Sequence, residues 1–76
     1  MKYIVNEIQT NFDNQVSNLV TAYDDQFDAE SAYHQILAYA AKSNLMMHTA
    51  MLYTNDGNTL RHETYTHPMP EPNSNE

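Results

Sequence analysis

Four histidines have the widest range of possible chemistry in this sequence, since histidine serves as a metal ligand, an acid or a base. They stand at His34, His48, His62 and His67. None has a second histidine four residues away, the spacing that places two ligands on one helical face. Glu30 precedes His34 by about one helical turn, but an exposed Glu–His pair without metal is the commoner arrangement. We therefore expect no metal and no other cofactor, and keep a metal-binding domain as an alternative.

The segment Arg61-His62-Glu63, together with His48, combines acidic and basic side chains. A catalytic site also needs a nucleophile, a group that stabilises developing charge and an enclosing fold. Neighbouring residues of a strand point to opposite faces, so this segment does not converge on one point. Polar residues on an exposed strand explain it better. We expect no enzyme and no catalytic residues.

Aromatic and sulfur-containing side chains favour a binding role instead. Six tyrosines and five methionines are many for 76 residues. Most of them are explained by core and interface packing, while some are candidates for stacking on a base or anchoring a protein partner. The residues that we expect to form a binding surface are Tyr33, His34, His48, Met51, Tyr53, Arg61, His62 and Tyr65.

The charge is strongly negative, with ten acidic residues against three basic ones and a net charge of −7. This charge disfavours direct binding to nucleic acid or to an anionic membrane surface. The acidic cluster at Asp24, Asp25, Asp28 and Glu30 has two interpretations. It imitates phosphates and occupies a basic groove of another protein, or it only stabilises the start of a helix. The sequence leaves both open, with the helix start as the simpler explanation.

The short chain limits what the core can contribute. A single domain of this size buries about 60% of its unfolded surface, and the sequence has no cysteine to form disulfides. We therefore expect a homo-oligomer, most simply a dimer. No apolar run approaches the roughly 20 residues of a membrane span, and the first residues do not resemble a signal peptide. These features predict a cytoplasmic protein.

Residue patterns divide the chain into five regular elements. β-branched and aromatic residues predict strands, while Asp24-Asp25 is a helix cap followed by helix-forming residues. The predicted elements are strands at 3–9 and 16–23, a helix from about 26 to 42, and strands at 45–54 and 59–67. Residues 1–67 are thus expected to form one domain. Residues 68–76 contain three prolines and are expected to be a disordered acidic tail.

The order β-β-α-β-β predicts an α+β fold, with a four-stranded, mainly antiparallel sheet and one helix on one face. Asp56-Gly57 is a strong hairpin signal. A two-residue loop there pairs Met51 with His62 and Tyr53 with Leu60 on one face, and Leu52 with Arg61 and His48 with Tyr65 on the other. Both faces carry apolar residues, whereas one helix covers one face only. The uncovered face, or the alanines Ala38 and Ala41 of the helix, is expected to contact another subunit or a ligand.

Several stretches of the sequence are distinctive: Lys2–Asn11, Thr21–Asp25, Ala29–Ser31 with Tyr33-His34, and His62–Tyr65. They resemble stretches of a family of small uncharacterised proteins of phages and prophages of Gram-positive gut bacteria. The resemblance implies no residue roles. It implies an inhibitor in the host cytoplasm that binds a host protein or sequesters a small nucleotide signal, with a minor virion or assembly protein as the alternative. The absence of coiled-coil heptads and repeats favours the inhibitor.

Overall fold

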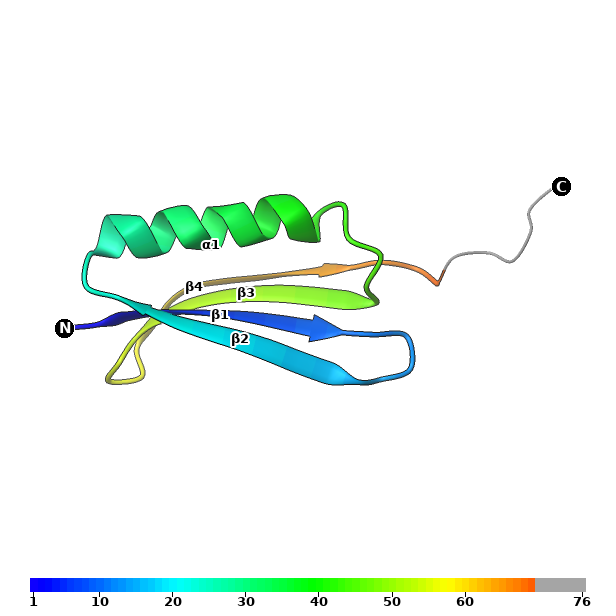
Figure 1. Ribbon diagram of the computed structural model, residues 1–76, viewed down its shortest axis with the longest axis horizontal. Helices are drawn as coiled ribbons and strands as arrows, with labels where there is room; N and C mark the ends of the chain where they lie inside the picture. Colours follow the sequence, from blue (N-terminus) through cyan, green and yellow to red (C-terminus); the bar gives the residue numbers. More distant parts are fainter. Residues whose placement is uncertain (70–76) are drawn as a thin grey trace, which may run out of the picture.

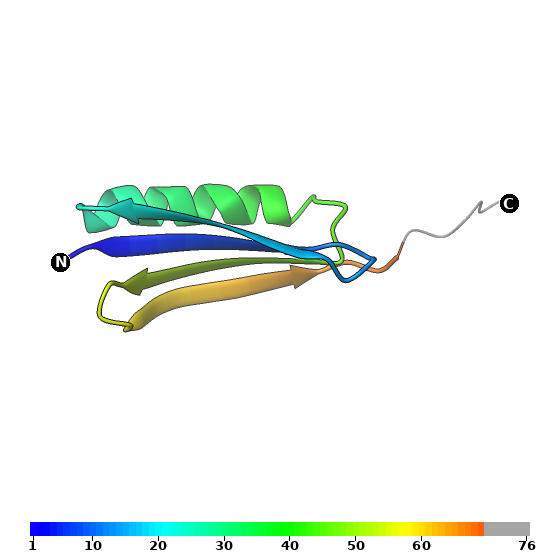
Figure 2. The same ribbon diagram turned by 60° about the horizontal axis from the view of Figure 1, so that its bottom comes forward.

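A single antiparallel sheet carries one helix on one of its faces (Figures 1 and 2). A computed structural model describes residues 1–69. The elements are β1 (Tyr3–Thr10), β2 (Val16–Tyr23), α1 (Gln26–Ala40), β3 (Met47–Thr54) and β4 (Thr59–Thr66). This arrangement confirms the α+β class and the β-β-α-β-β order. β2 has the predicted bounds, the other strands differ from the predicted bounds by one or two residues, and α1 ends two residues early.

The strand order is β2-β1-β3-β4, with β1 and β3 in the centre and β2 and β4 at the edges. Both β2 and β3 run antiparallel to β1. They are therefore parallel to each other, and α1 connects them across one face of the sheet. This crossover brings β1 beside β3, although 36 residues separate the end of one from the start of the other.

The β3–β4 hairpin pairs Met51 with His62, Leu52 with Arg61 and His48 with Tyr65, as predicted. The predicted pair of Tyr53 with Leu60 is wrong, because Tyr53 lies opposite Thr59. The loop is longer than two residues: Gly57 N–H donates to Thr54 C=O at 2.9 Å, and Thr54 N–H donates to Asn58 C=O at 2.9 Å. Gly57 takes a left-handed φ of 93°. Such a loop adds one residue to the second strand as a bulge, which is Leu60 here.

Helix α1 begins where the sequence places its cap. Asp25 has an extended backbone, and its side chain accepts a hydrogen bond of 3.3 Å from Asp28 N–H. The apolar residues of α1 recur at helical spacing, and this apolar stripe faces the sheet and packs mainly on β1 and β3. The buried core consists of Val5, Ala29, Tyr33, Ala50 and Leu52, with a few half-buried neighbours.

The remaining surfaces are thinly covered. Seven of the eight residues of β2 are exposed, and so are seven of the eight of β4. No helix within residues 1–69 is long and apolar enough to cross a membrane. Of the expected tail, Pro68 and Met69 have no regular structure, and residues 70–76 lie outside the described part of the chain.

Leu52→Ala tests how much this small core contributes to stability. Leu52 is the largest fully buried side chain, so its truncation is expected to cost about 2–5 kcal/mol and to lower Tm by about 10 °C or more. The matched control is Leu60→Ala, because Leu60 is 37% exposed. Thermal unfolding followed by circular dichroism should show a much smaller change for the control. Equal losses in both variants would contradict this assignment of the core.

Candidate functional site

The eight residues predicted to form a binding surface do not form one site. Tyr33, His34 and Arg61 line a cleft between α1 and β4, and His62 also borders it although its side chain lies on the opposite, open face of β4. Tyr65 lies opposite His48, on the face of the sheet that α1 covers. Met51 and Tyr53 lie on the opposite, uncovered face of the sheet. The structure thus separates three regions: the cleft, a buried polar cluster and the open face.

The cleft between α1 and β4 has a volume of about 420 Å³ and is lined by residues 59–63 in addition to Tyr33 and His34. Its one guanidinium is already paired, since Nη2 of Arg61 lies 3.3 and 3.5 Å from the two carboxylate oxygens of Glu30. Glu63 adds a second carboxylate. One cation against two anions leaves the cleft with a net charge of −1, which is unfavourable for a phosphate.

The environment of Tyr33 in the cleft changes the acidity of its hydroxyl. Burial raises its pKa above the ordinary value of 10, the charge of Glu63 raises it further, and Arg61 opposes both. The hydroxyl is therefore protonated at neutral pH. It has no hydrogen-bonded base among the described residues, so nothing activates it as a nucleophile.

A metal site is not assembled in the part of the chain that the structure describes. No group of three or more histidine, aspartate or glutamate side chains lies close enough to hold an ion. The carboxylate of Glu30, the partner considered for His34, instead accepts hydrogen bonds from Arg61 and, at 3.2 Å, from Gln26. Its oxygens are thus used inside the protein.

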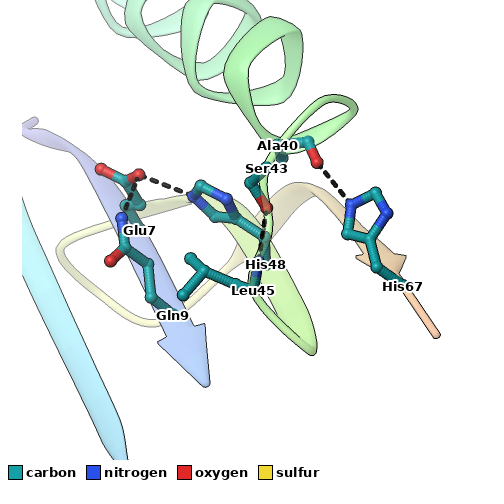
Figure 3. A network of polar contacts seen from close by, with 7 residues as sticks. All are labelled: Glu7, Gln9, Ala40, Ser43, Leu45, His48 and His67. Atoms are coloured by element: carbon teal, nitrogen blue, oxygen red, sulfur yellow. Dashed lines mark hydrogen bonds and ion pairs between the residues drawn. The ribbon is translucent and has the colours of Figure 1, made fainter. Parts of the chain in front are cut away.

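A buried polar cluster joins the two central strands (Figure 3). Nε2 of His48 lies 2.7 Å from Oε2 of Glu7, and Nε2 of Gln9 donates to the same oxygen at 2.9 Å. His48 is only 3% exposed, and its Nδ1 has no hydrogen-bond partner. His48 therefore contributes to the interior and not to a binding surface. The sequence does not show this pair, because it forms only when β1 lies beside β3.

Figure 3 also shows how the end of β4 is attached to the end of α1. Nε2 of His67 lies 2.9 Å from the carbonyl oxygen of Ala40, and His67 N–H donates to the carbonyl of Met46 at 2.9 Å. His67 thus adds a second contact to a carbonyl at the helix end, which also accepts a hydrogen bond from Ser43 N–H at 3.3 Å. This gives His67 a structural role.

The acidic cluster at the start of α1 is largely occupied by contacts within the chain. Asp25 caps the helix, Glu30 pairs with Arg61, and Asp24 pairs with Lys2. The hydrogen bond from Lys2 and its charge lower the pKa of Asp24 below its ordinary value. These contacts favour the helix-start interpretation over imitation of nucleic acid.

The open face is the sheet face opposite α1, and it carries no Asp, Glu, Lys or Arg. Alternation along the strands and the observed register assign to it four residues from each of the four strands, sixteen in all. They are Ile4, Asn6, Ile8, Thr10, Val16, Asn18, Val20, Ala22, Met47, Thr49, Met51, Tyr53, Thr59, His62, Thr64 and Thr66. In a chain with a net charge of −7, such a region is unusual and needs a physical explanation.

Comparison with family models, with curated proteins and with solved structures found no match for this chain. The resemblance to phage and prophage proteins therefore stays a prediction. Any functional conclusion rests on the surfaces described above.

Glu7→Leu tests the buried cluster. It leaves the ring of His48 buried with both nitrogens unpaired, so we expect a loss of about 1–3 kcal/mol in the free energy of unfolding. Adding His48→Leu should recover much of that loss, because an apolar pair leaves no unsatisfied group. Urea unfolding of both variants measures this, with Glu63→Leu on the exposed strand β4 as the control. A double variant with no higher free energy of unfolding than Glu7→Leu alone would contradict the proposed pairing.

Proposed function

We propose that this chain is a non-enzymatic binding protein that uses the open face to bind and block another protein. The absence of charged side chains from that face is the observation that carries the proposal. Along a strand of a sheet with one solvated face, polar and charged residues on that face normally alternate with apolar residues on the covered face. Here Ile4, Ile8, Met51 and Tyr53 are half-buried without any covering element, and Val16 and Val20 are exposed.

The size of the open face suits protein binding. Four strands of eight residues, about 4.8 Å apart and rising about 3.3 Å per residue, cover roughly 500 Å². About half of the residues on this area are apolar and the others are Asn, Thr or His, and exposed apolar patches of about a few hundred Å² are often functional. Aromatic and methionine side chains, here Tyr53, Met47 and Met51, are enriched at protein interfaces. The partner surface should be largely apolar, since the open face offers no charge to a basic or acidic one.

The cleft supports the two other functions less well. A nucleotide would bring several negative charges to a cleft whose own charge is −1 and whose Arg61 is held by Glu30. Acid–base catalysis would need side chains that converge. Arg61 and Glu63 are on the helix side of β4, whereas His62 is on the open face. Sequestration of a small nucleotide and enzymatic activity are therefore disfavoured.

In the context that the resemblance implies, the blocked protein is a host component and the chain acts in the host cytoplasm. The alternative is a minor virion or assembly protein, which would use the same face against a phage protein. Both functions require the open face, so they differ in the identity of the partner and not in the surface. Analysis of purified virions separates them, because an inhibitor of a host component is not expected there.

Met51→Glu tests the proposal by placing a charge at the centre of the open face. A tagged variant is expected to lose the protein that the wild type retains from lysate of infected cells, because burying an unpaired carboxylate is costly. The matched control is Gln35→Glu, which adds the same charge on the exposed side of α1. Mass spectrometry identifies the retained protein, and circular dichroism checks that both variants fold. Retention of the same protein by Met51→Glu would refute the proposed surface.

A further inference from the structure

The two edge strands differ in their protection against pairing with other strands. Natural sheets protect edges with charges, prolines or bulges. β4 carries Arg61, His62 and Glu63 at its centre and a bulge at Leu60. β2 has none of these devices: its sequence VSNLVTAY is uncharged, without proline or glycine, and pairs with β1 in unbroken register. β2 is therefore the edge of this sheet that is open to another strand.

Exposed apolar side chains are concentrated on the same strand. Val16 is 64% exposed, Leu19 65% and Val20 52%. Leu19 lies on the helix side of the sheet, since it is opposite Glu7, two residues from the core residue Val5. Helix α1 lies mainly over β1 and β3 and leaves Leu19 uncovered. Apolar surface is thus exposed on both faces of β2.

The backbone groups at this edge can be assigned from the observed hydrogen bonds. Asn11 N–H donates to Gln15 C=O at 2.9 Å, and these two residues lie directly opposite each other in the continued β1–β2 register. Hydrogen-bonded and non-hydrogen-bonded pairs alternate along an antiparallel ladder. The backbone N–H and C=O groups of the odd-numbered residues of β2 therefore point toward β1. The N–H and C=O groups of Val16, Asn18, Val20 and Ala22 consequently point away from the sheet.

We infer that a second copy of this chain pairs its β2 antiparallel with β2 across a two-fold axis. Only even-numbered residues can exchange hydrogen bonds, and the register that uses the whole free edge pairs Val16 with Ala22 and Asn18 with Val20. Leu19 then lies opposite Leu19 of the other copy. Four pairs with two bonds each contribute about eight hydrogen bonds between the copies. The result is a continuous eight-stranded sheet.

A second copy suits this edge better than a charged partner does. Each copy has a net charge of −7, so two copies repel each other. This repulsion is smallest when the surfaces in contact carry no charged side chains. β2 contains no acidic residue, and its pairing buries Leu19 against Leu19 on the helix side. Glu30 pairs with Arg61 of β4, so it marks the side of α1 that faces β4. The opposite side of α1 faces β2 and carries the half-buried Ile36 and the exposed Tyr39, which extend this apolar contact.

The dimer also enlarges the open face. The open faces of the two copies join into one uncharged surface of roughly 1,000 Å², twice the value for four strands. The inference does not depend on the proposed function, because strand pairing at the edge leaves Met51 and its neighbours free. Loss of the dimer and loss of partner binding can therefore be observed separately.

Cysteine cross-linking tests the register directly, because the chain has no cysteine of its own. In the paired dimer the two Leu19 residues form a non-hydrogen-bonded pair with Cα atoms about 4.5 Å apart, within the range of a disulfide. Leu19→Cys is expected to give a cross-linked dimer on a non-reducing gel after mild oxidation. Thr64→Cys, an exposed position on the other edge strand, is the matched control and should run as an uncross-linked single chain on the same gel. Equal cross-linking of the two variants would overturn the inference.

Proline substitution tests the dimer without a new disulfide. The N–H of Asn18 points away from β1, so Asn18→Pro keeps the β1–β2 ladder but removes one intermolecular donor from each copy. Light scattering should give 17.6 kDa (twice 8.8 kDa) for the wild type, and the variant should raise the dimer Kd about tenfold or more. Thr64→Pro on β4 should remain a dimer. A monomeric wild type at about 100 µM, or a dimer that Met51→Glu dissociates and Asn18→Pro does not, would show the inference to be wrong.

Discussion

The width of one helix limits how this chain can fold. A helix with its side chains is about 10–12 Å across, and strands lie about 4.8 Å apart, so α1 covers about two strands of four. It lies over β1 and β3, where Ala29 and Ala50 have no exposed surface and allow close contact. The edge strands and one whole face of the sheet are left without a covering layer. The core is therefore small, and much of the apolar surface remains available to other molecules.

The distribution of charge follows the same division. The carboxylates of the described residues lie in loops, on α1 or on the helix side of the sheet, where several are paired with Lys2, Arg61 or His48. The open face and β2 carry none. Charge thus keeps the copies of this chain apart everywhere except at the surfaces that we assign to binding and to dimerisation. The carboxylates that give the described residues their negative charge thus lie away from the open face and β2.

The pairing of the buried His48 with the half-buried Glu7 has a cost that apolar residues would avoid. Removing a carboxylate and an imidazole from water is unfavourable unless both are paired. The 2.7 Å contact and the hydrogen bond from Gln9 provide that pairing only when β1 lies beside β3 in the observed register. A shift by one residue would turn these side chains to the open face. The pair therefore disfavours alternative registers of the two central strands.

The sequence alone determined the local structure of this protein. The β-branched and aromatic content of residues 3–9 and 16–23, the helix-forming residues after Asp25 and the Asp25 cap depend on neighbours within a few positions, and the strands and the helix that they predict are observed. The α+β class and three of the four predicted β3–β4 pairs followed from them. The fourth predicted pair, Tyr53 with Leu60, is wrong because the turn formed by Gly57 adds one residue to the second strand and places Thr59 opposite Tyr53.

Only the tertiary structure decided the strand order, because the pairing of β1 with β3 depends on where α1 crosses the sheet and not on any local pattern. That pairing buried His48 against Glu7 and separated it from the cleft residues Tyr33, His34 and Arg61. It also made β2 an edge strand. The residues of the candidate surfaces were visible in the sequence, but which of them share a face is a consequence of contacts between distant segments.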